Sequence, residues 1–144
     1  MELLIVAGNQ VTKAPTIIGN SAPKSRAGFM VQCVDAKKHL YGLMIGSGKT
    51  PTPLLQFRII PHEPCHIVIS KNKNRWTAYV NGSRAAQTES PITYLDSPRS
   101  LFLGSWYSRN YRFTGKVREV RFFDAALTDR EVSRLYMRIA KEVV

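Results

Sequence analysis

Short extended segments are favoured by the hydrophobic pattern in the middle of the chain. His66–Ser70 and Trp76–Val80 are rich in β-branched and aromatic residues, and the polar segment Lys71–Arg75 joins them. Asn81-Gly82 follows, and this dipeptide favours the positive φ angles of a type I′ hairpin turn. We therefore expect another strand to begin near Arg84 and predict a meander of antiparallel strands.

Two further strands are predicted in the last third of the chain. The apolar run Leu101–Leu103 is closed by Gly104-Ser105, which indicates a buried strand that ends in a turn. The longer stretch Phe113–Phe123 places Val120 and Phe122 on one face and charged neighbours on the other. This second strand should have one face in water.

A short helix is predicted at the C-terminal end. Thr128-Asp129-Arg130-Glu131 matches the Ser/Thr-x-x-Glu capping box, in which two side chains bond backbone amides at a helix start. Apolar residues then recur at the spacing of one helical face. They are Val132, Leu135, Tyr136, Ile139, Ala140 and Val143. We expect this helix to pack on a sheet.

The first residues are interpreted as a strand and not as an export signal. Met1–Val6 is apolar but carries an acid where a signal peptide has bases, and Gln10 and Lys13 cut the apolar run short. No run approaches the roughly 20 apolar residues of a membrane span. We expect synthesis in the cytoplasm and leave the final compartment open, including display on a particle or larger assembly.

Three segments resemble one known family. Cys65–Gln87, Ser100–Ser105 and Phe113–Tyr136 are similar to the laminin G-like, concanavalin A-like lectin modules of the pentraxin and LamG types. The resemblance is good over Cys65–Tyr136 and loose over Glu2–Gly48. It implies an all-β fold, an antiparallel jelly-roll β-sandwich with a short C-terminal α-helix, in which residues 1–144 form a single domain.

Two departures from that family change what is expected. Such modules commonly begin with a further strand pair before the segment that resembles Leu3–Gly8, so we expect an open edge there, or one completed by a second copy or a larger assembly. The resemblance also implies calcium, which is frequent in these folds. Because Arg118-Glu119 stands where the family often has Asp-Glu, we predict no cofactor.

Composition agrees with one compact domain and adds a strong positive charge. The 144 residues are 44% hydrophobic, which suits a single sandwich core. Cys33 and Cys65 could pair, but we interpret both as free, buried apolar residues. The net charge of +11 favours anionic partners such as an acidic glycan or an acidic protein surface. Specific nucleic-acid recognition is not expected, because no groove-entering helix or stacking sheet accompanies the charge.

Several chemical motifs fail on inspection. Gly46–Thr50 is similar to the end of a phosphate-binding loop, but Leu43 stands where that motif requires glycine, and Pro51 follows where a helix should begin. His62–His66 offers nitrogen and sulfur ligands, yet no distant pair completes a zinc site. The 10 acidic residues lack the Glu-x-Asp-x-x-Glu spacing of retaining glucanases. We predict no metal site and no catalytic residues, so the protein should not be an enzyme.

The candidate ligand-binding residues lie in the loop Ser105–Phe113. Aromatic rings alternate there with planar hydrogen-bond donors, which suits stacking on sugar rings and pairing with carboxylates or phosphates. The predicted residues are Trp106, Tyr107, Arg109, Asn110, Tyr111 and Arg112. In the alternative interpretation, Trp106 or Tyr111 closes the open end of the core and the arginines form a solvated rim.

Two functions from different classes remain. The first is a non-catalytic binding module for carbohydrate recognition or adhesion. The second is a structural or assembly subunit, such as a phage or virus particle protein, that docks on acidic neighbours through basic residues such as Arg130, Arg134 and Arg138. The first is our leading hypothesis, because the family's usual ligands are sugars or proteins.

Overall fold

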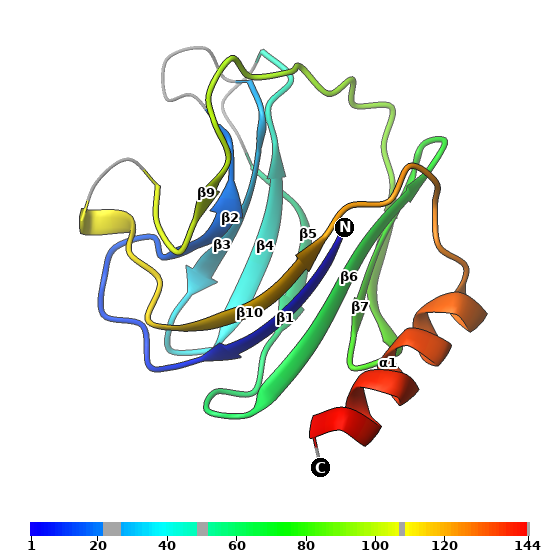
Figure 1. Cartoon of the computed structure of the whole chain (residues 1–144). Coiled ribbons are helices and arrows are strands. Elements are labelled where there is room, and N and C mark those ends of the chain that lie inside the picture. The colour runs from blue at the N-terminus through cyan, green and yellow to red at the C-terminus, as the bar shows by residue number, and fades with distance from the viewer. Residues whose placement is uncertain (22–26, 49–51, 107–108, 144) are drawn as a thin grey trace.

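The protein is a jelly-roll β-sandwich, as predicted. The computed structural model describes residues 1–21, 27–48, 52–106 and 109–143. In these residues, ten strands form two antiparallel five-stranded sheets that face each other, and the helix α1 (Asp129–Val143) follows the last strand (Figure 1). No helix in this described part is long and apolar enough to cross a membrane.

The first sheet, called sheet A, contains the predicted meander. Its strands in spatial order are β10 (Gly115–Arg121), β1 (Glu2–Ala7), β6 (Pro64–Asn72), β7 (Arg75–Val80) and β8 (Ser83–Glu89). Asn81 and Gly82 have φ angles of 50° and 80°, and Val80 pairs with Ser83 across the turn. The predicted type I′ hairpin is therefore confirmed, with β8 beginning one residue before the expected position.

The second sheet, called sheet B, is built mainly from the first half of the chain. Its strands in spatial order are β5 (Pro53–Arg58), β4 (Leu40–Ile45), β3 (Phe29–Asp35), β2 (Thr16–Gly19) and β9 (Phe102–Leu103). Thus β2 to β5 are neighbours both in sequence and in space, and β9 joins their edge from far along the chain (Figure 1). This late strand brings the Ser105–Phe113 loop to the β2 side of the sandwich.

The N-terminal strand lies inside sheet A and not at an edge. β1 pairs with β10 on one side, from Glu2–Arg121 to Ala7–Gly115, and with β6 on the other. The prediction that Met1–Val6 forms a strand is confirmed. The expectation of an open edge at this strand is wrong, because β10 from the C-terminal third fills the position that we assigned to a missing strand or a partner.

The main core lies between the two sheets and is made of the inward-facing residues of both. It includes Leu3, Ile5, Val31, Tyr41, Leu43, Phe57, Ile67 and Trp76. Trp76 is 6% exposed and belongs to this cluster together with Ala78. Cys33 and Cys65 are free and buried, as predicted. Alternate residues of each strand thus meet across the sandwich.

The prediction of a buried strand at Leu101–Leu103 is wrong. Only Phe102 and Leu103 form a strand, and Leu101 and Leu103 are 43% and 55% exposed. β9 is the edge strand of sheet B and has β2 as its one neighbour. A two-residue strand at the edge of a sheet has a neighbouring strand on one side and is open on the other. The apolar run Leu101–Leu103 alone was therefore not sufficient evidence that these side chains are buried.

The strand predicted over Phe113–Phe123 is shorter than expected and contains a bulge. β10 pairs Glu119 with Leu4 but Val117 with Ile5, so Arg118 is the extra residue. The bulge resets the alternation, and Val117 and Val120 both pack against the main core. Phe122 lies beyond the strand end and is 58% exposed, because no partner strand continues past Arg121.

Helix α1 packs on the outer face of sheet A, as its apolar stripe predicts (Figure 1). Val132 is fully buried and forms a second small core with Val68 and Tyr79. The Tyr79 hydroxyl donates a 2.6 Å hydrogen bond to Asp129 at the helix start. Burial, and then this bond, raises the pKa of Tyr79 to about 12.

The predicted capping box is confirmed at the start of α1. The Thr128 amide donates to Glu131 Oε2 at 2.7 Å, and the Glu131 amide donates to Thr128 Oγ1 at 3.3 Å. The two side chains therefore satisfy two backbone donors that have no partner inside the helix.

We expect Thr128→Ala to lower the free energy of unfolding by about 1 kcal/mol, because the amide of Glu131 loses its acceptor. Thr128→Ser keeps the hydroxyl and should stay close to the wild type. Urea denaturation followed by circular dichroism measures both variants. An alanine variant as stable as the serine variant would contradict the role of the cap.

Candidate functional site

The loop between β9 and β10 is fastened to the edge of sheet B at its base. Gly104 has a φ of 76°, and its amide donates to the Ile17 carbonyl at 2.8 Å. The Phe113 amide then donates to the Gly104 carbonyl at 2.8 Å, and the Phe113 ring is buried in the main core. The two ends of the loop are thus held together on the β2 side of the sandwich.

Two of the predicted aromatic residues contact each other. The rings of Trp106 and Tyr111 meet edge to face at 69°, with their centroids 4.7 Å apart. Trp106 Nε1 also donates a 2.9 Å hydrogen bond to the Ser21 carbonyl, which fixes the orientation of the indole. Both side chains are half-buried, so each presents part of its surface to solvent.

The other predicted residues are brought to the same loop to different degrees. Asn110 belongs to a short 3₁₀ helix, Arg109–Tyr111, and its carbonyl accepts from the Ala14 amide at 3.5 Å. Arg112 is exposed, and its carbonyl accepts from Thr12 Oγ1 at 2.9 Å. Tyr107 and the side chain of Arg109 lie outside the described residues.

The two interpretations of this loop are therefore both reflected in the geometry. The Trp106–Tyr111 pair is a structural element, because it ties the loop to Ser21 and packs ring against ring. The pair is also partly exposed, and the exposed residues Asn110 and Arg112 flank Tyr111 in the chain. A rigid, partly exposed aromatic pair next to polar donors is an arrangement that can bind a ring-shaped polar ligand.

Sequence reasoning missed the residues that hold this loop in place. Gln10 exchanges two hydrogen bonds with the backbone of Thr114, of 2.8 Å and 2.7 Å. Ser21 supplies the acceptor for Trp106 through its carbonyl, which any residue type could provide. These partners lie far apart in the sequence, so no local pattern could have identified them.

The residues present do not fit a metal centre in the segment His62–His66. Cys65 faces the main core, where burial raises the pKa of its thiol to about 12, whereas a metal-bound cysteine must be deprotonated. The neighbouring His66 points to the opposite face of sheet A and bonds Glu2.

The calcium that the family resemblance implies does not fit the described residues either. Glu119 forms a 2.9 Å ion pair with Arg121, and the basic residue Arg118 precedes it. In the described residues no three His, Cys, Asp or Glu side chains come together as metal ligands would. Calcium prefers a cluster of carboxylate and carbonyl oxygens. The described residues around Glu119 do not form such a cluster.

A family model decides the classification of this sandwich. The laminin G-type model for the concanavalin A-like lectin/glucanases superfamily matches residues 9–133. The chain belongs to this superfamily. The resemblance seen in the sequence is therefore confirmed. A comparison with curated protein sequences gave no match.

Solved structures with the same fold are similar to this superfamily member at low sequence identity. A putative carbohydrate-binding protein from Bacteroides ovatus has a TM-score of 0.69 and 19% identity over 92% of this chain and 39% of its own. The SAP-like pentraxin of Limulus polyphemus has a TM-score of 0.67 and 14% identity over 94% of this chain and 67% of its own. This superfamily member thus spans well under half the length of the Bacteroides protein.

A third similar structure is a carbohydrate-binding module. The CBM40 of the Ruminococcus gnavus IT-sialidase has a TM-score of 0.72 and 12% identity over 94% of this chain and 81% of its own. The same module has been solved bound to α2,3-sialyllactose. At these identities the similarity establishes a shared fold for this superfamily member, and the ligands are properties of the neighbours.

Proposed function

We propose that this superfamily member is a non-catalytic glycan-binding module and that the loop Ser105–Phe113 carries its site. The observation that carries the proposal is the edge-to-face pair of Trp106 and Tyr111, fixed by the hydrogen bond from Trp106 to Ser21. A ring held in one orientation binds without losing further side-chain freedom, so the site is preorganised.

The chemistry of the loop favours an acidic sugar. Aromatic faces pack against the C–H faces of sugar rings, and the exposed guanidinium of Arg112 can pair with a carboxylate. The net charge of +11 attracts anionic ligands over a longer range. Structural neighbours named for carbohydrate binding, one of them solved with a sialylated sugar, support the same ligand class.

The absence of a catalytic role is part of this proposal. Several acidic side chains are already engaged in structural contacts. These pairs are Glu2 with His66, Glu89 with Arg75, Glu119 with Arg121, and Asp129 with Arg84. A retaining glycosidase needs two carboxylates about 5 Å apart at the substrate, which is a poor match to carboxylates committed to basic partners. The assembly alternative, a phage or virus subunit, receives no support from these comparisons, and we do not pursue it.

The test is a glycan array followed by titration calorimetry with an acidic glycan from it. We expect Trp106→Ala to weaken binding about ten-fold or more, which corresponds to about 1.4 kcal/mol. The variant lacks the indole ring, and Tyr111 loses the ring against which it packs. Phe122→Ala removes a more exposed aromatic ring elsewhere on the surface and is the control. Stacking is not screened by ions, so part of the affinity should persist at moderate salt.

Arg112→Gln separates the two halves of the site. This variant should weaken binding of acidic glycans and leave that of neutral ones nearly unchanged, because only the acidic sugars use the guanidinium. The proposal fails if the folded wild-type protein binds no glycan on the array. It also fails if Trp106→Ala and Phe122→Ala weaken binding equally.

A further inference from the structure

A cavity opens between the two sheets at the end of the sandwich that carries the β6–β7 turn. Its volume is about 460 Å³, within the range of small-molecule sites. Inward-facing residues of both sheets line it, including Leu43 and Ile45 of β4 and Ile69 of β6. The segment Phe122–Leu127, between β10 and α1, lines it as well.

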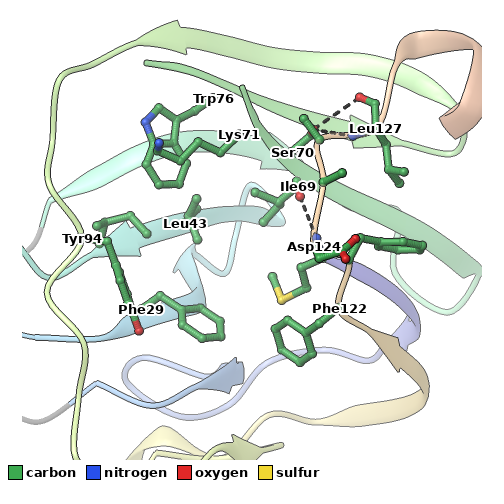
Figure 2. A pocket seen from close by; sticks show the side chains of 15 residues that line it. Phe29, Leu43, Ile69, Ser70, Lys71, Trp76, Tyr94, Phe122, Asp124 and Leu127 are labelled. Carbon is green, nitrogen blue, oxygen red and sulfur yellow. Dashed lines mark hydrogen bonds between the residues drawn. The ribbon is translucent and has the colours of Figure 1, made fainter. Parts of the chain in front are cut away.

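The cavity is mainly apolar and has aromatic walls. Figure 2 shows the rings of Phe29, Trp76, Tyr94 and Phe122 around the open space. Phe29 and Phe122 contact each other edge to face, with centroids 6.4 Å apart, and Phe122 remains 58% exposed. Protein interiors leave few voids larger than one water molecule, so an open apolar space of this size is suited to an added apolar group.

One buried donor on the cavity wall has no partner. Trp76 is 6% exposed, and its Nε1 makes no hydrogen bond within the described residues. Buried indole N–H groups normally find an acceptor, and leaving one without a bond is unfavourable. This donor is buried and not open to the cavity, so a ligand oxygen would reach it only after the indole turns. The missing bond is an observation separate from the shape of the cavity.

A cation lies beside that donor. Lys71 is the strand partner of Trp76, and its Nζ is 5.5 Å from the centroid of the indole ring. It follows Ile67 and Ile69 in the inward-facing row of β6, so the row that builds the core ends in a positive charge at the cavity. Figure 2 shows Lys71 extending across the Trp76 ring.

Ser70 and Asp124, two other polar lining residues, do not replace this pair. Ser70 Oγ accepts from the Leu127 amide at 3.1 Å and donates to the Leu127 carbonyl at 3.3 Å, so its one donor is already used. Asp124 is the one side-chain carboxylate among the described lining residues, and it is exposed on the segment that leads to α1. Lys71 and Trp76 therefore form a donor pair on the strand side of the cavity, across from the exposed segment that carries Asp124.

We propose that this cavity binds a small apolar molecule with a carboxylate head group, such as a medium-chain fatty acid. The apolar body lies against Phe29, Leu43 and Phe122, and the head group faces Lys71 beside the Trp76 ring. The site is separate from the proposed glycan loop. Each proposal can fail without the other, because the loop residues whose side chains are described, Trp106, Asn110, Tyr111 and Arg112, do not line the cavity.

The experiment uses decanoate as the probe and Trp76 as the reporter. The chain has 2 tryptophans, so Trp106→Phe leaves Trp76 as the single source of indole emission. We expect a saturable change in this emission as decanoate is added to the full chain. Phe122→Ala should raise the dissociation constant about five-fold or more, because the exposed wall of the cavity is lost. Leu101→Ala, an exposed apolar change outside the cavity, is the matched control.

The role of the cation is tested with Lys71→Met. This variant should weaken decanoate binding about three-fold or more, whereas decanol, which lacks the charge, should bind it as well as it binds the parent. The control is Lys116→Met, which removes an exposed basic residue at the end of β10 far from Phe122. This variant should bind both ligands as the parent does. The proposal is overturned if the folded protein shows no saturable change in Trp76 emission with decanoate. It is also overturned if Phe122→Ala and Leu101→Ala change the dissociation constant of decanoate equally. The same holds if Lys71→Met weakens the binding of decanoate and of decanol equally.

Discussion

Replacement of His66 by leucine should lower the free energy of unfolding by about 3–5 kcal/mol, one of the two largest effects that we expect in this protein. His66 Nε2 lies 2.8 Å from Glu2 Oε1, and their side chains are 1% and 2% exposed. The substitution would leave the Glu2 carboxyl group buried beneath α1 without this partner. A buried polar group that loses its bond is more costly than a pair that is absent from the start.

The surroundings of the pair explain why solvent cannot compensate. Tyr136 of α1 stacks on the His66 ring, with centroids 6.0 Å apart, and closes the site from outside. Arg121 Nη1 is 3.8 Å from Glu2 Oε2. This longer contact comes from a half-exposed side chain, so it should recover only part of the lost interaction.

The matched control is the double variant Glu2→Leu with His66→Leu. Removing both partners leaves no uncompensated group, so the double variant should be more stable than His66→Leu alone. Urea unfolding of the wild type, both single variants and the double variant gives the interaction energy of the pair. A loss of unfolding free energy in the double variant equal to the sum of the losses in the two single variants would contradict a coupled buried pair.

Gly115→Ala should destabilise the protein by about 3 kcal/mol or more, because the position combines backbone strain with a steric block. Gly115 has a φ of 149°, and an added Cβ would overlap the carbonyl oxygen of Val6 on the neighbouring strand. The ring of Phe113 would lie 2.9 Å from the same carbon. Neither obstacle is the flexible end of a side chain, so β1 and β10 would have to separate.

Gly104→Ala provides the comparison, because Gly104 also has a positive φ, 76°, but no atom of the described residues lies within 4 Å of an added Cβ. This variant should lose only the conformational cost of about 1–2 kcal/mol. Thermal or urea unfolding of both variants separates strain from overlap. Equal losses would mean that the contact with Val6 relaxes easily and that the pairing of β1 with β10 is more adaptable than its geometry indicates.

The elements that the sequence predicts well carry their signal within a few residues. Asn81-Gly82 determines a turn through its own φ angles, and Thr128 with Glu131 marks a helix start through two local bonds. The family resemblance supplies the sandwich. The exposure of Leu101 could not be inferred in the same way. Whether a side chain is buried depends on which strands lie around it, and the strand beside β9 is far away in the sequence.

The candidate site shows the same limit more strongly. The composition of the loop identifies Trp106 and Tyr111 as candidates, but their mutual contact and the bond to Ser21 depend on how β9 docks against β2. The cavity was not predicted, since Trp76 appears only as a core residue in the pattern. Its unpaired Nε1 and the position of Lys71 at the end of an inward-facing row become visible when both sheets are in place.

The interior position of β1 in sheet A sets the order in which the newly synthesised chain can fold. Sheet B, apart from β9, and the β6–β8 meander join segments that are close in sequence, so they can form soon after leaving the ribosome. β1 must wait for β6 on one side and for β10, where Glu2 meets Arg121, on the other. Although β1 precedes the other strands of the sandwich in the sequence, it is therefore among the last to be fully paired, and until then its apolar strand edge is exposed to chaperones and to other chains.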